Sequence, residues 1–319
     1  MNNPKVSVCI PVYNSAAYLA PAVESALAQC YESFEILIVD DCSTDGSAEI
    51  ATGFAGRDGR VRFVPNSINL GMVKNWNHCL ELARGEYIKF LFGDDLLSSP
   101  HNLERLAGVL DRHPEVRLAC SYRSLIDDNG HVTAERGFTP TGRPVPGLLA
   151  IRDCLIAAKN YIGEPSVVMF RKQQARRGFH NGYRQMVDLE MWFYLLMEGD
   201  LWCEREPLAA FRHHPEQQTV KNAEELIHLE ETLRLYDAYL HASGVRLHRL
   251  LETALYYVQC YQVWKGHRHK GILNREQAER IISRYIPIKR FMRLIPLYKT
   301  FNPLWKLVLS ARRHYPISR

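Results

Sequence analysis

The sequence predicts an α/β fold, with a mostly parallel sheet covered by helices on both faces and a mainly helical C-terminal extension. Three observations predict it. Short apolar runs alternate with stretches of helical length through the first hundred residues. These runs are apolar almost throughout, as expected of strands in a covered parallel sheet. From residue 223 to residue 285 the pattern becomes mostly helical.

Repeated strand–helix units organise the first hundred residues, and their crossovers should be right-handed. Asn14 or Ser15 is expected to cap the first helix, and Gly85 to end the third. The predicted strands are 6–10, 34–39, 61–64 and 86–91, and the predicted helices are 16–29, 46–55 and 72–83.

The pattern loosens after Pro100, although further elements can still be predicted. Asp127-Asp-Asn-Gly130 is typical of a turn. The predicted helices are 102–112, one within 145–165 and 187–199, and the predicted strands are 116–122, 166–170 and short strands within 202–212. Composition alone suggests a boundary near residue 220.

Composition and charge are those of an ordinary globular protein. The 319 residues are 46% hydrophobic and 24% charged, with a net charge of +5. No signal peptide and no membrane-spanning segment are expected. The eight cysteines form no CxxC pair, so neither a zinc site nor a disulfide framework is indicated, and a cytoplasmic location is the simplest setting.

Two acidic pairs follow predicted strands. Asp40-Asp41 comes after the second strand and Asp94-Asp95 after the fourth. Ligands of open parallel sheets bind beyond the carboxyl ends of the strands, so both pairs should lie along one rim. Each pair alone is explained by a turn or a helix cap. Two pairs on one rim favour a divalent cation, Mg²⁺ or Mn²⁺, that bridges a phosphorylated ligand.

The order of these motifs resembles a known family. The stretch VSVCIPVYNSAAYLAPAVESALAQCYESFEILIVDDCSTDGS, continued by NLGMVKNWNHCLELARGEYIKFLFGDDLLSSP, is similar to family 2 glycosyltransferases. The resemblance covers roughly residues 4 to 215. It implies the Rossmann-like GT-A fold and an inverting enzyme of the type that makes bacterial cell-surface polysaccharides. It also implies a catalytic domain over 1–220, with a nucleotide-sugar half at about 1–100 and an acceptor half at about 101–220, before the extension 221–319.

The resemblance assigns most site residues to the nucleotide sugar. One carboxylate of the Asp40-Asp41 pair would accept a hydrogen bond from uracil, and Asp94 would contact the ribose. The nucleotide-sugar-binding residues implied are Pro11, Tyr13, Asn14, Asp40, Asp41, Asn69, Gly71, Asn75 and Asp94.

The resemblance also implies a metal site and a base. Asp94 and Asp95 would hold Mg²⁺ or Mn²⁺ on the diphosphate, with His214 as a third ligand or a phosphate contact. Asp188 would be the general base that takes a proton from an acceptor hydroxyl. The implied reaction transfers a hexose from a nucleotide-diphosphate sugar, most simply a UDP-sugar, to a glycan or lipid-linked acceptor.

Two departures from the family pattern bear on activity. Phe92 stands where many relatives have the first acidic residue of a spaced Asp-x-Asp, and Val187 stands where Glu is common before the base. Both remove an acidic group. A catalytically weakened sugar-nucleotide-binding protein of the same fold is therefore the alternative function.

Structural roles are open for several of these residues. Asp188 could only cap its helix, and His214 could lie in a surface turn. Arg123 is expected as a solvated surface charge, and Trp76 as part of the core.

The C-terminal segment 287–319 is basic, with aromatic and aliphatic residues between the charges. Two interpretations stay open: peripheral contact with an anionic membrane on its inner face, or a helix packed on the protein.

Other functions fit the sequence less well. A dehydrogenase requires a glycine-rich turn after the first strand, and PVYNSAAY contains no glycine. A receiver domain is much shorter, with its acidic pair expected after the first strand. Nucleic-acid binding has only the basic tail in its favour.

Overall fold

A computed structural model describes residues 3–137, 142–214, 217, 222, 227–242, 245, 247, 249–270 and 273–296, without the side chains of 250 and 267–270. The chain divides into two compact units. The first, here the sheet unit, comprises 1–150, 160–182 and 187–215. The second, here the helical unit, comprises 151–159, 183–186 and 216–319. Two short internal segments thus belong to the helical unit, although the sheet unit surrounds them in sequence.

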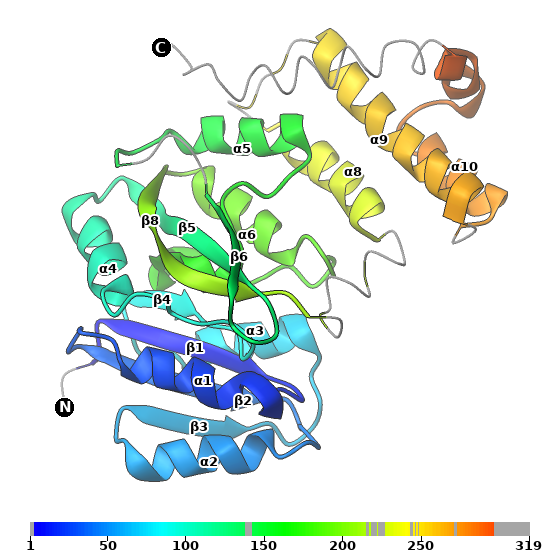
Figure 1. The fold of residues 1–319 in the computed structure, drawn as a ribbon. Coiled ribbons are helices and arrows are strands. Elements are labelled where there is room, and N and C mark those ends of the chain that lie inside the picture. Colours follow the sequence, from blue (N-terminus) through cyan, green and yellow to red (C-terminus); the bar gives the residue numbers. More distant parts are fainter. Residues whose placement is uncertain are drawn as a thin grey trace. The chain divides into compact units, whose positions relative to one another are not determined.

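Four parallel strands form the first half of the sheet: β1 (Val6–Val12), β2 (Phe34–Asp40), β3 (Val61–Pro65) and β4 (Tyr87–Phe90). Their order is β3-β2-β1-β4 (Figure 1). Val12 lies opposite Asp40, and Asp40 lies opposite Pro65. The loops that follow these strands therefore leave the sheet at the same end, beyond the carboxyl ends of the strands.

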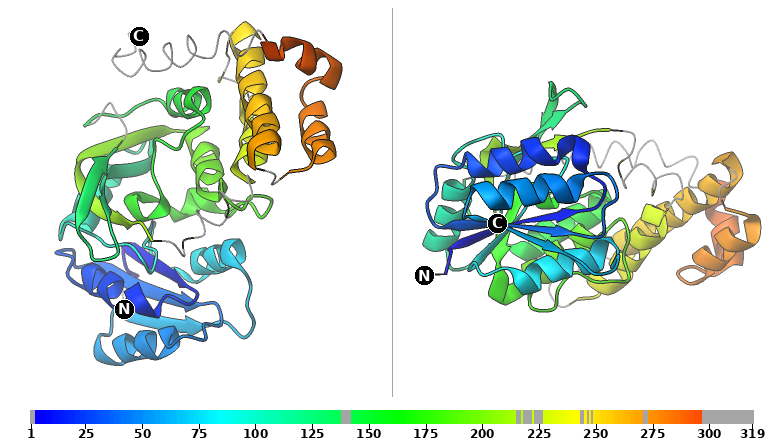
Figure 2. Two further views of the ribbon diagram at one scale, coloured as in Figure 1. Left: turned by 45° about the vertical axis from the view of Figure 1, so that its right-hand side comes forward. Right: turned by 90° about the horizontal axis from the view of Figure 1, so that it is seen from below.

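Three helices cover this parallel half. α1 (Ala16–Leu27) and α2 (Ser47–Arg57) lie on one face, and α3 (Met72–Leu82) lies on the other (Figure 2). Right-handed crossovers require this division, because the chain moves outward from β1 to β3 and then returns past β1 to β4. β1, β2 and β4 are buried almost throughout, as their apolar sequences predict, whereas β3, the outer strand, is only partly buried.

The second half of the sheet is mixed. β7 (Val168–Arg171) pairs antiparallel with β4 and with β5 (Val116–Ile126), which also pairs antiparallel with β6 (Val132–Arg136). β8 (Asp200–Arg212) runs parallel to β5. A bridge between Leu96 and Ala210 brings the end of β8 beside the loop that follows β4.

The remaining elements of the sheet unit are α4 (Asn102–Arg112), α6 (Val187–Leu196) and two 3₁₀ turns, Pro165–Val167 and Lys172–Ala175. α5 (Gly147–Ala157) begins in the sheet unit and ends in the helical unit. The predicted α/β class is confirmed. The short strands expected within 202–212 are instead part of one long strand, β8.

Gly85 has a different role from the predicted helix stop. α3 ends at Leu82, and Gly85 is not in the left-handed region that such a stop uses. A Cβ at Gly85 would lie 2.4 Å from the backbone nitrogen of Ser7 and 2.7 Å from the carbonyl carbon of Val6. The glycine is therefore required by the close approach of the chain to β1.

The helical unit contains α8 (Ile227–Tyr239), α9 (Arg249–Lys270) and α10 (Arg275–Ser283), the last begun by a capping box of Asn274 and Gln277. Phe291, at the start of the basic segment, is fully buried against the rings of Tyr257 and Trp264. Residues 297–319 of that segment lie outside the described residues. In the described parts of the chain, no helix has the length and apolar character needed to cross a membrane.

Replacing Gly85 by alanine should lower the free energy of unfolding by about 1–3 kcal/mol, because the added Cβ overlaps backbone atoms of β1. Urea denaturation measures the change. Gly53→Ala is the matched control, since a Cβ there meets nothing within 4 Å, and alanine in α2 should be neutral or stabilising. Equal stability of the two variants would contradict the packing argument.

Candidate functional site

The loops after β1 and β2 are held together by hydrogen bonds. The Asn14 N–H donates to the Ser43 hydroxyl at 2.9 Å, and the Thr44 N–H donates to the Asn14 side chain at 2.8 Å. Asp45 accepts from the Ala16 N–H at 2.9 Å. The expected side-chain cap of α1 is therefore absent from Ser15, and Asp45 from the neighbouring loop fills that role.

The Asp41 carboxylate is used inside the protein. Its Oδ1 accepts from the Leu70 N–H at 2.7 Å and from Asn66 at 2.9 Å, and its Oδ2 accepts from the Gly71 N–H at 2.8 Å. Asn69 donates to the Asp41 carbonyl at 2.9 Å. Asp41 is buried and fixes the loop before α3, where Gly71 has a positive φ of 81°.

Asp40 is different. It is also buried, and its Oδ2 accepts from the Ser43 N–H at 3.1 Å. Its Oδ1 has no hydrogen-bond partner among the described residues. A buried polar atom without a partner is costly, so this oxygen is the one able to gain from a ligand donor.

The other expected nucleotide-binding residues lie around these loops. Pro11 lies in β1 opposite Val39, and the side chain of Tyr13 is exposed beyond the strand end. Asn75 is buried in α3, where it donates to the Val39 carbonyl at 3.2 Å and accepts from Asn66 at 3.0 Å. The bonds of Asn75 support the loop from inside.

The end of β8 brings His214 to the second acidic pair. His214 Nε2 lies 3.1 Å from Asp94 Oδ2. The Arg212 N–H donates to Asp95 Oδ1 at 3.0 Å, and the Arg212 guanidinium donates to the Asp94 carbonyl at 2.9 Å. Residues more than a hundred positions apart thus form one cluster, which contains the Asp94, Asp95 and His214 that the family resemblance groups together.

Asp95 is fully buried, and its Oδ2 finds no hydrogen-bond partner among the described residues. Burial, together with the neighbouring Asp94 carboxylate, raises the pKa of Asp95 well above its ordinary value. Lys89, also fully buried, donates to the Ser166 carbonyl, and burial lowers the pKa of Lys89 to about 7. Adjacent carboxylates in this setting favour an added cation.

The residues present fit a divalent metal. The unpartnered Oδ2 of Asp95 and the Asp94–His214 pair are oxygen and nitrogen donors suited to such an ion. Within the described parts of the chain, no group of three or more His, Cys, Asp or Glu residues is placed to hold a metal by itself. An ion held here would take its remaining ligands from elsewhere, such as phosphate oxygens.

Phe92, two residues before Asp94, belongs to an aromatic cluster. Its ring lies 4.9 Å from that of Trp76, which also contacts Phe179 at 5.2 Å and Phe90 at 6.3 Å between ring centroids. Trp76 is buried, as expected of a core residue. The position of the missing carboxylate is therefore part of a packed apolar layer.

Asp188 lies in the first turn of α6, and the residue as a whole is partly exposed. Its Oδ2 accepts from the Asn160 side-chain amide at 3.0 Å, and its Oδ1 accepts from the Leu189 N–H at 2.7 Å. Burial of the carboxylate raises the pKa of Asp188 to about 7, and the negative charge of Glu164 adds to the rise. A carboxylate with this pKa is suited to accept a proton near neutral pH.

The other acidic residue of this helix start is neutralised. Arg177 donates two hydrogen bonds to the Glu190 carboxylate, at 2.7 and 2.6 Å, and Glu190 is buried. Asp188, in contrast, accepts hydrogen bonds from neutral donors in the described structure. Of the two carboxylates, Asp188 is the one fit to act as a base.

Asn160 and Glu164 were not among the residues expected from the sequence. Glu164 forms an ion pair with Arg123, whose Nε lies 2.6 Å from Glu164 Oε2. Arg123 is therefore a buried, paired residue rather than the surface charge expected from the sequence. The negative charge of Glu164 raises the pKa of both Asp95 and Asp188, although burial is the largest cause at each. Glu164 thus acts electrostatically on both the acidic cluster and the expected base.

Comparisons with known proteins identify the family of the chain. The family model described as Glycosyl transferase family 2 matches residues 7–179. A protein of Mycobacterium tuberculosis, "Uncharacterized protein MT1568", is 35% identical over 68% of this chain and 70% of its own length. "Putative glycosyltransferase EpsE" of Bacillus subtilis is 30% identical over 70% of this chain and 80% of its own length.

Solved structures show the same fold. S. aureus TarS 1-349 in complex with UDP-GlcNAc matches with a TM-score of 0.60 and 20% identity, over 83% of this chain and 73% of that TarS 1-349 chain. The mannosyltransferase PcManGT from Pyrobaculum calidifontis, in complex with GDP-Man and Mn²⁺, matches with a TM-score of 0.58 and 14% identity, over 97% and 84%. The fold is of the GT-A type, and the chain belongs to glycosyl transferase family 2.

Proposed function

We propose that this glycosyltransferase is a metal-dependent inverting enzyme, which moves a sugar from a nucleotide-diphosphate sugar to a hydroxyl of a glycan or lipid-linked acceptor. One observation carries the proposal. Asp188 is a partly exposed residue whose buried carboxylate has a pKa near 7, and Glu164 acts electrostatically on both Asp188 and Asp95. The chain segment 160–166 also connects the two regions: Asn160 donates to Asp188 Oδ2, and the Ser166 hydroxyl accepts from the Phe92 N–H, two residues before Asp94. A base and a cation site joined in this way would serve one reaction.

The loops beyond β1 and β2 would bind the nucleotide. Asp40 Oδ1 is available to a ring N–H of the base, such as that of uracil, because the described residues leave it without a donor. The solved complexes of TarS and PcManGT contain a uridine and a guanosine nucleotide sugar respectively. A UDP-sugar is the simplest donor for this chain.

A divalent cation would be held by Asp94 and Asp95, with His214 beside them. When bound, the cation neutralises negative charge that develops on the leaving diphosphate. The main-chain and guanidinium bonds of Arg212 hold both aspartates in place, so little rearrangement is required when the donor binds.

Asp188 would accept the proton of the acceptor hydroxyl as that oxygen attacks the anomeric carbon. Asn160 donates to Asp188 Oδ2 and orients the carboxylate. A single displacement of this kind inverts the configuration at the anomeric carbon. The alternative, a catalytically weakened sugar-nucleotide-binding protein, is disfavoured because neither Phe92 nor Val187 removes the base or the acidic pair.

Asp40 and Asp41 should respond differently to substitution by asparagine. Asp41→Asn should lower the free energy of unfolding by about 2 kcal/mol or more, because the charged acceptor of three hydrogen bonds is lost. Asp40→Asn should change it by less than about 1 kcal/mol while weakening UDP binding about tenfold or more. Urea denaturation and UDP titration provide the measurements. A large loss of stability in Asp40→Asn, with weaker UDP binding in Asp41→Asn, would contradict these assignments.

Nucleotide sugars should stabilise the protein only with a divalent cation. We expect UDP-GlcNAc or another UDP-sugar to raise the melting temperature in Mn²⁺ and to lose most of that effect in EDTA. His214→Ala should weaken the Mn²⁺ dependence, whereas His213→Ala, which alters the exposed neighbouring side chain, should leave it unchanged. Failure of UDP- and GDP-sugars alike to stabilise the protein with Mn²⁺ would refute the donor assignment.

Turnover should depend on the ionised form of Asp188. Because the pKa of Asp188 is raised to about 7, kcat/KM should fall with a slope of one proton as the pH drops below about 7. Asp188→Asn should reduce turnover by about 10²- to 10⁴-fold and retain UDP affinity. Release of nucleoside diphosphate from the stabilising donor measures turnover and its pH dependence. UDP titration measures the affinity. Near-normal turnover in Asp188→Asn would rule out this base.

A further inference from the structure

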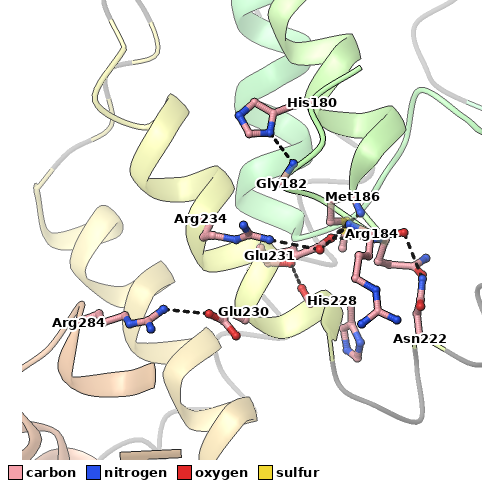
Figure 3. A network of polar contacts seen from close by, with 12 residues as sticks. His180, Gly182, Arg184, Met186, Asn222, His228, Glu230, Glu231, Arg234 and Arg284 are labelled. Atoms are coloured by element: carbon pink, nitrogen blue, oxygen red, sulfur yellow. Dashed lines mark hydrogen bonds and ion pairs between the residues drawn. The ribbon is translucent and has the colours of Figure 1, made fainter. Parts of the chain in front are cut away.

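Helix α8 contains a buried carboxylate with an unusual set of partners. Glu231 is 2% exposed and accepts hydrogen bonds from three consecutive backbone N–H groups. The distances are 2.6 Å to Arg184, 2.8 Å to Gln185 and 2.8 Å to Met186 (Figure 3). All these residues belong to the helical unit. Arg234 lies 3.3 Å from the same carboxylate.

These three N–H groups stand directly before α6, which begins at Val187. The helix dipole makes the N-terminus of a helix positive, so an anion beside it is favourable. Here the anion comes from a residue more than forty positions later in the chain. Asn222 reinforces the segment by donating to the Arg184 carbonyl at 3.2 Å and to the Gln185 side chain at 2.8 Å. The segment is thus held firmly two residues before Asp188.

The same helix also holds the segment that leads to Asn160. The Tyr236 hydroxyl is buried and donates to the Leu155 carbonyl at 3.0 Å, near the C-terminal end of α5. Ala158, just after α5, has a positive φ of 49°, which is uncommon for alanine. The chain then reaches Asn160, whose amide donates to Asp188. Both chain segments that enter the base site are therefore anchored on α8.

We infer that Glu231 is a positioning residue for the reaction: α8, through Glu231 and Tyr236, fixes the start of α6 and the end of α5, and so sets the position of Asp188 and of Asn160. The inference rests on the proposed role of Asp188 as the base. It gives α8 a part in catalysis that acts through Asp188 and Asn160. Small displacements of a catalytic group reduce the rate strongly, while binding of a distant ligand is unaffected.

Glu231→Gln tests this inference. The variant leaves one carbonyl oxygen for three N–H donors. We expect faster hydrogen exchange at 184–186, a fall in kcat of about tenfold or more, and an unchanged affinity for UDP in Mn²⁺. Glu230→Gln is the matched control, because Glu230 is the adjacent residue of α8 and forms a more exposed ion pair with Arg284 at 2.9 Å (Figure 3). This control should resemble the wild type in all three measurements.

A purely structural role for Glu231 predicts a different result in combination with Asp188→Asn. If Glu231 acts through the base, the double variant should turn over no more slowly than Asp188→Asn alone. If Glu231→Gln lowers turnover by the same factor in both backgrounds, or leaves kcat equal to that of Glu230→Gln, the positioning role is wrong. Near-normal turnover of Asp188→Asn alone would instead refute the proposed function.

A second variant covers the case in which Glu231→Gln does not fold. Tyr236→Phe removes only the hydroxyl that donates to Leu155. We expect a smaller fall in kcat, of about threefold or more, with UDP affinity unchanged. A kcat equal to that of the wild type would overturn the inference in this arm.

Discussion

The rest of the site depends on the repulsion between two adjacent carboxylates at the end of a buried strand. Asp95 is fully buried beside Asp94. The Arg212 N–H donates to the Asp95 carboxylate, the Arg212 guanidinium donates to the Asp94 carbonyl, and the His214 imidazole contacts the Asp94 carboxylate. β8 has to run past the end of β4 to deliver Arg212 and His214 there. The mixed half of the sheet thus supplies Arg212 and His214 to the acidic pair that follows the parallel half.

The first acidic pair shows how neighbouring residues of one type come to differ. Asp41 is an internal acceptor that shapes the loop before α3, whereas Asp40 retains a free oxygen in the described structure. Sequence alone gives both residues the same description. Only the partners distinguish a carboxylate that builds the loop from one that remains for a ligand. The same distinction separates Glu190, bound to Arg177, from Asp188.

Much of the parallel half could be predicted from sequence, because apolar strands and polar strand ends are local patterns. The acidic pairs and His214 were proposed as site residues in this way, with the family resemblance, and the structure brings His214 to Asp94. Asn160, Glu164 and Glu231 were not, because their roles depend on contacts with residues distant in sequence. The prediction that Gly85 ends the third helix was wrong for a related reason. The constraint on Gly85 comes from its contact with β1, not from the preceding helix α3. From the sequence, Phe92 marked only the loss of a carboxylate. In the structure, its ring packs against that of Trp76.

The proposed anchoring on α8 of the two segments that lead to Asp188 and to Asn160 has an evolutionary consequence. Residues that would recognise the nucleotide belong to the sheet unit, while the groups that fix the approach to Asp188 belong to the helical unit. Sequence drift in the C-terminal helices would then change the speed of the reaction in descendants of this chain without changing the nucleotide they use. Selection could adjust these two properties independently, through separate stretches of the gene.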